Sequence, residues 1–297
     1  MIIVKLKGGM GNQMFQYALG RHLAIKHKTS LKLDLTFLLD RTPRKDFVFR
    51  DYDLDIFTLT VDVATPKNLK PFREFRIPQL TKAYNILPRL LKRPHVIVEP
   101  HFHFSEAILS APDNVYLDGY WQSEHYFRDV EDVIRKDFTF KDALDEKGSR
   151  MAQAINAEPG AVCLNVRRGD FVTLKKAADF HGSVGVDYYQ KAIDLLVQRG
   201  VQPHLFIFSD DIEWCTEHLK FDHPTTFVTG EYAGKKFEQY LHLMTLCKHY
   251  IIPNSTFAWW GAWLSKHSDK IVIAPKRWFM DPTINTTDII PAGWIRI

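Results

Sequence analysis

The second half of the chain alternates between segments that resemble buried strands and segments with helical periodicity. Continuous apolar runs predict strands at 161–166, 204–208, 225–229, 250–252 and 270–274. Helical spacing predicts helices between them, at 188–197, 212–219, 237–247 and 257–264. Because neighbouring parallel strands need a crossover between them, this alternation predicts a doubly wound parallel sheet. Ligands bind such sheets at the carboxyl ends of the strands.

The first half opens with the same alternation and then becomes irregular. Strands are predicted at 2–6, 31–35, 96–99 and 115–120, and helices at 13–26 and 123–135. The polar segment 141–160 ends in Glu-Pro-Gly, which is typical of a break between domains. We therefore expect two α/β lobes, residues 1–155 and residues 156–297.

The composition is ordinary for a soluble protein and excludes several classes of function. The chain has 297 residues, and its net charge of +4 gives no general nucleic-acid footprint. No apolar run approaches the roughly 18 residues that span a bilayer, and the apolar start is too short for a signal peptide. The three cysteines form no CxxC pair and are expected to be reduced core residues. A cytoplasmic location is the default expectation.

One segment departs from this balance. Pro66 to His95 carries eight lysines and arginines and a single acidic residue, Glu74. A solvated helical face is the favoured interpretation. The alternative is a peripheral contact with anionic lipid headgroups at the inner face of the membrane.

The segment Asn165 to Phe171, NVRRGDF, leaves the first strand of the second half. Side chains alternate along a strand, so Asn165 and Arg167 face one way and Arg168 the other. The planar fork of an arginine at the carboxyl end of a parallel strand suits a diphosphate. The alternative role for either arginine is an ion pair between the lobes. This alternative is favoured more strongly for Arg168 than for Arg167.

The next strand ends in FSDD, Phe208 to Asp211. The carboxylates of Asp210 and Asp211, with Ser209, could accept hydrogen bonds from a purine base or from ribose hydroxyls. The alternative is a helix N-cap formed by Ser209 or Asp210.

Two further polar turns run directly into predicted helices, where free backbone N–H groups and the helix dipole favour an anion. The later turn offers Asn254, Ser255 and Thr256 to a phosphate. The earlier turn, GGMGNQ, has the wrong glycine spacing for a dinucleotide fingerprint. We predict that four residues of this turn contact a donor. The glycines would let the backbone come close to it and the amides would form hydrogen bonds with it: Gly9, Gly11, Asn12 and Gln13.

Asp51, Asp53 and Asp55 form an alternating acidic run that invites a metal site. Alternate acidic residues on a short strand or loop are more often a solvated edge. We expect no metal there.

Taken together, these stretches resemble the α1,2-fucosyltransferases of glycosyltransferase family 11. That family opens with a GGxGNQxFQYA-like turn and carries HxRRGD, FSDD and CKHxIxxNSSFSWWGAWL-like motifs. The corresponding motifs here are GGMGNQMFQYA, NVRRGD, FSDD and CKHYIIPNSTFAWWGAWL. YLDGYWQSEHYF and the closing WIRI are also similar to the family. The resemblance spans nearly the whole chain.

The resemblance implies a GT-B-like fold of two Rossmann-like lobes with the nucleotide-sugar site between them. It also implies transfer of fucose from GDP-fucose to the 2-hydroxyl of a terminal β-galactoside, without metal and with inversion at C1. Arg167, aided by Asn12 and the Ser255–Thr256 helix start, would neutralise charge that grows on the β-phosphate. Arg168 would be a second, structural partner.

Two points stay open at this level. Asp170 and His181 both follow the arginine pair in a predicted polar loop, and either could be the base for the acceptor hydroxyl. Asn165 stands where the family motif has histidine, and an amide cannot become cationic. Two other functions compete: a fucosyltransferase that forms another linkage, and a non-catalytic module that binds a nucleotide or glycan.

Overall fold

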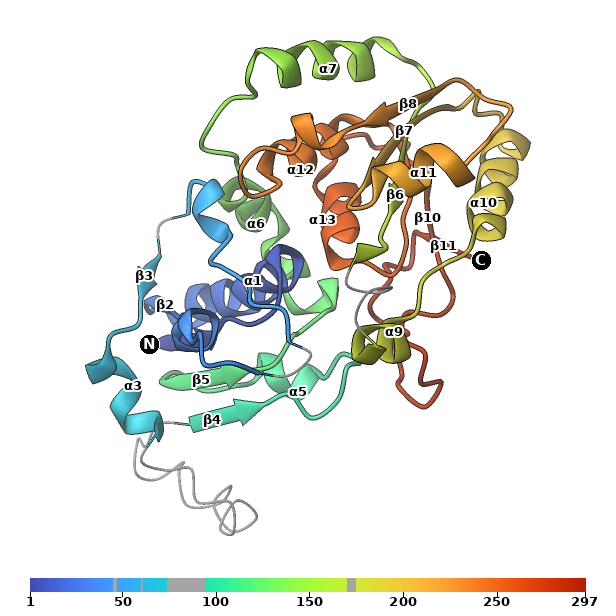
Figure 1. The fold of residues 1–297 in the computed structure, drawn as a ribbon. Helices are drawn as coiled ribbons and strands as arrows, with labels where there is room; N and C mark the ends of the chain where they lie inside the picture. The colour runs from blue at the N-terminus through green and yellow to red at the C-terminus, as the bar shows by residue number, and fades with distance from the viewer. Residues whose placement is uncertain (45–46, 60, 74–94, 170–174) are drawn as a thin grey trace. The chain divides into compact units, whose positions relative to one another are not determined.

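The computed structural model describes residues 1–44, 47–59, 61–73, 95–169 and 175–297 (Figure 1). Its chain divides into two compact units. Unit 1 comprises Met1–Pro43, Phe49–Thr139 and Thr287–Ile289, and unit 2 comprises Arg44–Val48, Phe140–Thr286 and Ile290–Ile297. Each unit contains one parallel sheet, so the prediction of α/β architecture with two parallel sheets is confirmed.

The main passage between the units lies at Thr139–Phe140. The polar segment in which the sequence predicts the boundary forms helix α7 (Glu146–Ala157), which Asp145 caps through its bond from Gly148 N at 2.7 Å. This helix belongs to unit 2 by its contacts. The predicted division into an acceptor-side and a donor-side lobe at 155/156 concerns function and stays a prediction.

Unit 1 is built on a sheet with the strand order β3-β2-β1-β5-β4. Its strands are β1 (Ile2–Lys5), β2 (Leu31–Asp34), β3 (Asp62–Val63), β4 (His95–Val98) and β5 (Val115–Asp118). Its helices are α1 (Met10–His27), α2 (Thr36–Leu39), α3 (Pro66–Arg73), α5 (Glu106–Leu109) and α6 (Glu131–Asp137), with short 3₁₀ turns η1 (Leu54–Ile56), η2 (Glu124–Tyr126) and η3 (Arg128–Val130). The chain runs from β1 outward to β3 and later returns to pair β5 with the other side of β1, so the strand order reverses between β1 and β5.

Helix α1 packs closely against β1. A Cβ at Gly20 would collide with Cγ2 of Val4, so only glycine permits this approach. One face of the sheet therefore lies against α1. The residues that alternate with Val4 along β1, Ile3 and Lys5, point to the other face.

The helix predicted at 123–135 is wrong in its first half. The structure has η2 and η3 there, and the α-helix begins only at Glu131. Phe127 breaks the helix with φ −140° because its fully buried ring packs on Phe15, with centroids 6.2 Å apart. Tertiary packing overrides the local helical pattern here.

Unit 2 contains a sheet with the strand order β11-β10-β9-β6-β7-β8. Its strands are β6 (Ala161–Val166), β7 (His204–Ser209), β8 (Thr225–Val228), β9 (His249–Ile251), β10 (Val272–Ala274) and β11 (Ile295–Arg296). Its helices besides α7 are α9 (Lys175–His181), α10 (Val186–Gln198), α11 (Ile212–His218), α12 (Glu238–Leu246) and α13 (Thr256–Leu264), with the 3₁₀ turn η4 (Gly230–Tyr232). The predicted alternation of strands and helices is confirmed.

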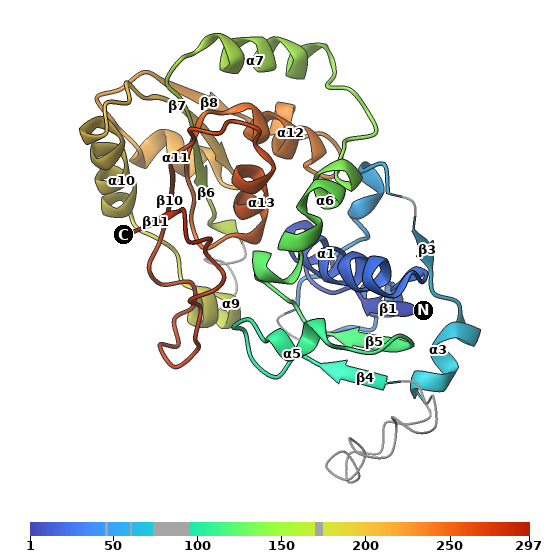
Figure 2. The same cartoon turned by 180° about the vertical axis from the view of Figure 1, so that it is seen from behind.

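Helices cover both faces of this second sheet (Figures 1 and 2). Ile193 of α10 and Cys215 of α11 share one buried cluster with Leu164 of β6. On the other face, Phe208 of β7 meets Tyr240 of α12 edge to face, at 5.5 Å between ring centroids. The chain goes from β6 outward to β8 and then returns to β9 on the other side of β6. The strand order therefore reverses between β6 and β9, where such sheets bind ligands.

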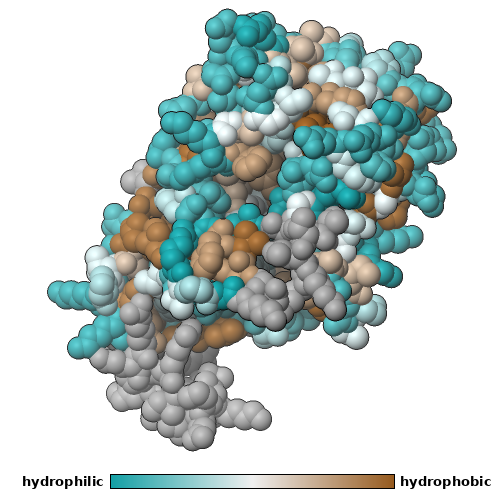
Figure 3. All heavy atoms as spheres, in the orientation of Figure 1, coloured by the Kyte–Doolittle hydropathy of each residue, from teal (hydrophilic) through white to brown (hydrophobic). Residues whose placement is uncertain are grey.

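The basic segment 66–95 is described only in part. Its start forms α3 and its end begins β4, whereas residues 74–94 lie outside the described residues, so the predicted lipid contact falls largely on them. Hydrophilic and hydrophobic residues are interspersed on the face drawn in Figure 3. Among the helices that the structure describes, none has the length and apolarity needed to cross a membrane.

Candidate functional site

The polar motifs of the second half converge at one edge of the unit 2 sheet. Strands β9, β6 and β7 are neighbours in that order, and Val166 at the end of β6 pairs in register with Ser209 at the end of β7. Because the strands are parallel, the segments that follow all three of them leave from the same edge. The structure thus brings together the three segments 252–256, 167–169 and 209–211, as the sequence predicts.

Arg167 is held by a carboxylate from the neighbouring segment. Its NH1 group lies 2.8 Å from Oδ2 of Asp210, and the two side chains are 28% and 18% exposed. Oδ1 of the same carboxylate accepts a bond from the backbone N of Arg168 at 2.8 Å. A Cβ at Gly169 would collide with Oδ2 of Asp210, so this glycine permits the close approach. Asp210 therefore fixes both the arginine and the loop that carries it.

Arg168 lies in a second, separate contact. Its Nε donates to Oδ2 of Asp211 at 3.1 Å, and its guanidinium stacks on the ring of Trp214 at 3.8 Å from the centroid. The side chains of the two arginines thus bind different carboxylates. Both groups that the Arg168 side chain contacts belong to α11 or its cap, so this ion pair lies within unit 2 and is not the pair between lobes that the sequence left as an alternative.

Ser209 and Asp211 also serve the local fold. The N-cap of α11 is Asp211, whose Oδ1 accepts from Trp214 N at 3.2 Å. The sequence had left Ser209 or Asp210 as the alternative N-cap, and that alternative is wrong. Ser209 instead accepts the backbone N–H of Asp211 at 2.9 Å and is buried. Asp211 caps the helix because the carboxylate of Asp210 binds Arg167 and the backbone N of Arg168 instead.

Asn165 is buried inside the edge of the sheet. Its Nδ2 donates to the backbone oxygen of Phe208 at 3.2 Å, and the residue is 7% exposed. The amide therefore joins β6 to β7 close to the arginine loop.

The turn before α13 supplies a capped helix start. Ser255 is the N-cap, and its hydroxyl accepts from Ala258 N at 3.4 Å. Thr256, the first helical residue, is partly exposed. A helix N-terminus carries partial positive charge, so this turn adds positive charge to the sheet edge at which Arg167 lies.

Asn254 ties other segments to this helix start. Its Nδ2 donates to the backbone oxygens of His181 at 2.8 Å and Trp278 at 3.0 Å. Its Oδ1 is buried and has no partner among the described residues. The side chain, predicted to contact a donor, thus positions the end of α9.

The two residues considered as the base have different outcomes. His181 is the last residue of α9, not part of a loop as predicted, because Phe180 and His181 pack on Phe279 with ring centroids 4.7 and 5.6 Å away. Asp170 lies outside the described residues.

The glycine-rich turn of unit 1 follows β1, at the point where that sheet reverses its strand order. Gly9 is the N-cap of α1, and Gly11 is buried in its first turn. Oδ1 of Asn12 accepts a bond from Nε2 of Gln122 at 2.9 Å, which joins the start of α1 to the segment after β5. Asn12 and Gln122 therefore lie on the two sides of the reversal.

Gln13 and the acidic run form one structural unit. The fully buried Nε2 of Gln13 donates to the oxygens of Gly8 and Asp51, at 3.0 and 2.8 Å, and Oε1 accepts from Asp53 N at 3.0 Å. Asp51 pairs with Arg41. These contacts give the amide a structural role. Within the described ranges, no group of three or more His, Cys, Asp or Glu side chains could hold a metal ion.

Sequence reasoning missed a cluster that follows β5. Oε2 and Oε1 of Glu99 accept from the backbone N of Tyr120 and Trp121 at 2.7 and 2.8 Å. Burial raises the pKa of Glu99 by disfavouring its charged form, while the two N–H bonds act in the opposite direction. Trp121 has φ +57° and is fully buried, a conformation that costs backbone strain.

Two buried polar atoms of this cluster have no partner among the described residues. They are Nε1 of Trp121 and Oε1 of Gln122. Strain and unpaired buried polar groups gather at functional sites. The signal in the sequence was the segment YLDGYWQ, whose similarity to the family carried no assigned role.

Comparison with known proteins identifies what this arrangement is similar to. The family model described as Glycosyl transferase family 11 matches residues 1–297. An α-1,2-colitosyltransferase of Escherichia coli is 33% identical over 300 residues, covering 100% of this chain and 98% of that protein. A galactoside α-(1,2)-fucosyltransferase 1 of Rattus norvegicus is 30% identical over 160 residues, or 50% of this chain and 41% of the rat protein.

A solved structure, that of the NodZ α-1,6-fucosyltransferase soaked with GDP-fucose, resembles this chain at a TM-score of 0.43 and 14% identity. The match covers 89% of this chain and 92% of that one.

Proposed function

Because this glycosyltransferase belongs to family 11, we propose that it transfers fucose from GDP-fucose to the 2-hydroxyl of a terminal β-galactoside, with inversion at C1 of the fucose. The observation that carries the proposal is the Arg167–Asp210 pair at the reversal of the unit 2 sheet, on the same edge as the capped start of α13. Partial identity to an α-(1,2)-fucosyltransferase supports the linkage.

The chemistry asks for stabilisation of negative charge. As the bond from C1 to the diphosphate breaks, charge grows on the β-phosphate oxygens, and fixed cationic donors lower the energy of that state. The guanidinium of Arg167 suits this role because Asp210 holds it in place before the donor arrives. We assign Arg168, Asn165 and Asn254 to positioning, since each of them bonds to neighbouring protein groups.

The acceptor hydroxyl must lose a proton as it attacks C1 from the side opposite the diphosphate. Asp170 or His181 would accept that proton. Asp170→Asn should slow transfer strongly with little change in GDP affinity, and His181→Ala should slow it less. An equal loss of GDP affinity in Asp170→Asn would make this residue an orienter of the arginines instead.

We further propose that transfer needs no metal, because Arg167 and the α13 start supply positive charge. Full activity in excess EDTA is the expected result. Loss of activity that manganese or magnesium restores would contradict it and return attention to Asp53 and Asp55.

A second donor has specific support. The 33% identity to an α-1,2-colitosyltransferase extends over nearly both whole chains. Colitose is 3-deoxyfucose, so both transfers would form an α1,2 linkage and differ in one hydroxyl of the donor.

The deciding experiment measures GDP release from GDP-fucose and from GDP-colitose, each with and without a β-galactoside, and determines the linkage of the product by NMR. Galactoside-dependent release from GDP-fucose with a 1→2 product is expected. If only GDP-colitose is turned over, the donor is GDP-colitose rather than GDP-fucose. If the product has another linkage, the acceptor hydroxyl is not the 2-hydroxyl. If neither donor is turned over, the protein is better described as a binding module.

A further inference from the structure

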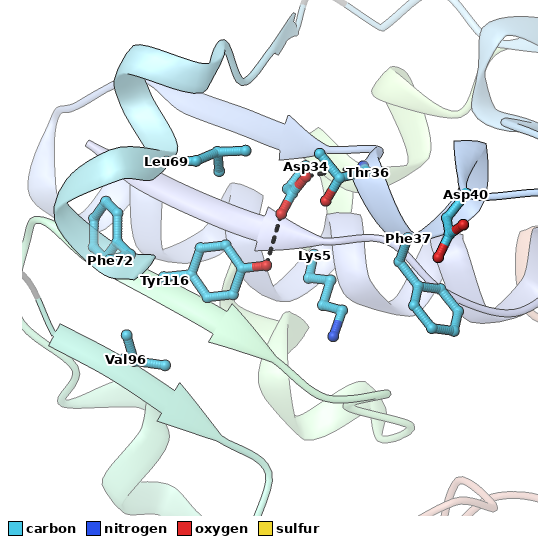
Figure 4. A pocket seen from close by; sticks show the side chains of 9 residues that line it. All are labelled: Lys5, Asp34, Thr36, Phe37, Asp40, Leu69, Phe72, Val96 and Tyr116. Carbon is cyan, nitrogen blue, oxygen red and sulfur yellow. Dashed lines mark hydrogen bonds between the residues drawn. The ribbon is translucent and has the colours of Figure 1, made fainter. Parts of the chain in front are cut away.

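Unit 1 contains a cavity that none of the sequence motifs points to (Figure 4). Its volume is about 390 Å³. It lies on the sheet face opposite α1, because Lys5, the last residue of β1, and Tyr116 of β5 line it. Asp34, the last residue of β2, is a third lining residue. The cavity thus opens at the carboxyl ends of β1 and β2, the edge at which parallel sheets bind ligands.

One wall of the cavity is apolar and aromatic. Leu69 and Phe72 of α3 and Val96 of β4 line it, and the rings of Phe72 and Tyr116 lie 5.8 Å apart. Phe37 of α2 adds a partly exposed ring on the other side of the cavity (Figure 4). These faces suit the C–H surface of a ligand rather than a hydrated ion.

Apart from the Phe37 ring, the rest of the lining is polar, and neighbouring protein groups hold most of these polar side chains in place. The hydroxyl of Tyr116 donates to Oδ2 of Asp34 at 2.7 Å, and Thr36 N donates to Oδ1 at 2.9 Å. Asp34 is only 3% exposed. Nζ of Lys5 lies 2.9 Å from Oδ2 of Asp118 and 5.2 Å from the Phe37 ring centroid. Asp40 is the second lining carboxylate.

This combination selects a class of ligand. Two lining carboxylates disfavour an anion such as a nucleotide. The ammonium of Lys5 and the carboxylate of Asp40 carry charge, which a purely apolar molecule would cover at a cost. A sugar presents hydroxyls that can donate to carboxylates and accept from lysine, and C–H faces that can pack on aromatic rings. A volume near 400 Å³ is within the usual range for a small-molecule site and leaves room for one or two sugar rings.

We propose that this cavity binds a sugar unit of the glycan acceptor other than the galactoside that receives the transferred residue. The proposal rests on the proposed function, since it names a second contact of the same acceptor. The cavity would make the enzyme prefer longer glycans over the minimal galactoside.

The test compares two acceptors, lactose and a tetrasaccharide that ends in the same β-galactoside. Phe37→Ala removes a ring from the cavity, and Asp40→Asn removes a charge with almost no change in shape. Leu39→Ala is the matched control on the same helix, because Leu39 is 61% exposed and does not line the cavity. Saturation-transfer NMR of the tetrasaccharide without donor gives a second readout that needs no turnover.

Both cavity variants should lower kcat/KM for the tetrasaccharide by about fivefold to tenfold, the effect of a lost stacking contact or charged hydrogen bond. The value for lactose should change by less than about twofold, and Leu39→Ala should resemble the wild type. Equal losses for both acceptors, or no loss with the tetrasaccharide, would overturn the proposal. If neither acceptor is fucosylated but Phe37→Ala still abolishes the NMR signal of the tetrasaccharide, the proposed function fails and the sugar site stands.

Discussion

The two sheets of this protein present different chemistry at the places where their strand order reverses. In unit 2 the reversal lies beside paired ions, Arg167 with Asp210 and Arg168 with Asp211. In unit 1 it lies beside the amides of Asn12 and Gln122.

The difference shows what each edge is suited to bind. A fixed guanidinium group, that of Arg167, and a helix N-terminus suit a phosphate, whose charge is permanent. Amide groups are neutral donors and acceptors, so they suit a neutral, hydroxylated ligand better than a phosphate. We therefore propose an anion edge in unit 2, formed by Arg167 and the start of α13, and a hydroxyl edge in unit 1, formed by Asn12 and Gln122. This assignment differs from the sequence-based expectation that Asn12 helps to neutralise the β-phosphate.

The largest expected effect is at the anion edge. Arg167→Ala should lower kcat by about a hundredfold to a thousandfold, because a fixed donor to the growing charge is lost. Steady-state kinetics and circular dichroism measure activity and folding together. Arg150→Ala, which removes an exposed arginine from an i,i+4 pair on α7, should leave both unchanged. A folded Arg167→Ala variant with near-normal turnover would remove the basis for the anion edge.

A subtler change tests whether Asp210 positions that arginine. The Cβ of Gly169→Ala would push the Asp210 carboxylate away from its bonds to Arg167 and Arg168. We expect kcat to fall by about tenfold to a hundredfold, less than in Arg167→Ala, because the guanidinium remains but is misplaced. Gly185→Ala is the matched control, since a Cβ there has no neighbour within 4 Å. Equal activity of the two alanine variants would show that catalysis does not depend on the position of the Asp210 carboxylate.

The hydroxyl edge should respond through the acceptor alone. Gln122→Ala removes the bond to Asn12 and an unpaired buried oxygen, and should raise KM for the galactoside about fivefold, near the value of one hydrogen bond. KM for GDP-fucose should stay within about twofold. Gln190→Ala, on the surface of α10, serves as the control. A rise in the donor KM instead would reverse the assignment of the two edges.

The smallest effect concerns stability and lies away from both edges. Burial lowers the pKa of His249, and the nearby charges of His267 and Lys248 lower it further. Because the folded pKa lies below the unfolded value, neutral His249 contributes stability that is present above the unfolded pKa. That contribution is lost as the pH falls through the folded value.

Protonation would also remove the bond that Ile271 N donates to Nδ1 of His249 at 3.2 Å. Urea unfolding at pH 7 and pH 5 should therefore show a smaller loss of unfolding free energy in His249→Gln than in the wild type. Gln190→Ala, a substitution of a non-titrating residue on the surface of α10, should keep the wild-type pH dependence. An unchanged pH dependence in His249→Gln would contradict the role given to burial.

The sequence by itself determined the two sheets, except for their two-residue edge strands β3 and β11, and the order of the motifs along them. Continuous apolar strands in alternation with helices have few stable arrangements, so the polar segments after 166, 209 and 251 had to meet at one edge. That argument needs only the periodicity of the chain.

Tertiary structure alone decided which partner each side chain takes. That Asp210 binds Arg167 while Asp211 caps α11 depends on the register of Val166 with Ser209. Phe127 interrupts a predicted helix because its ring is buried, and Trp121 takes φ +57° because Glu99 binds the backbone around it. The cavity beside Lys5 is formed by residues from β1, β2, α2, α3, β4 and β5, and no local pattern records a space enclosed by segments so far apart. Local sequence preferences decide where helices and strands form. The pairing of side chains and the shape of a cavity arise only when segments that are distant in the sequence pack together.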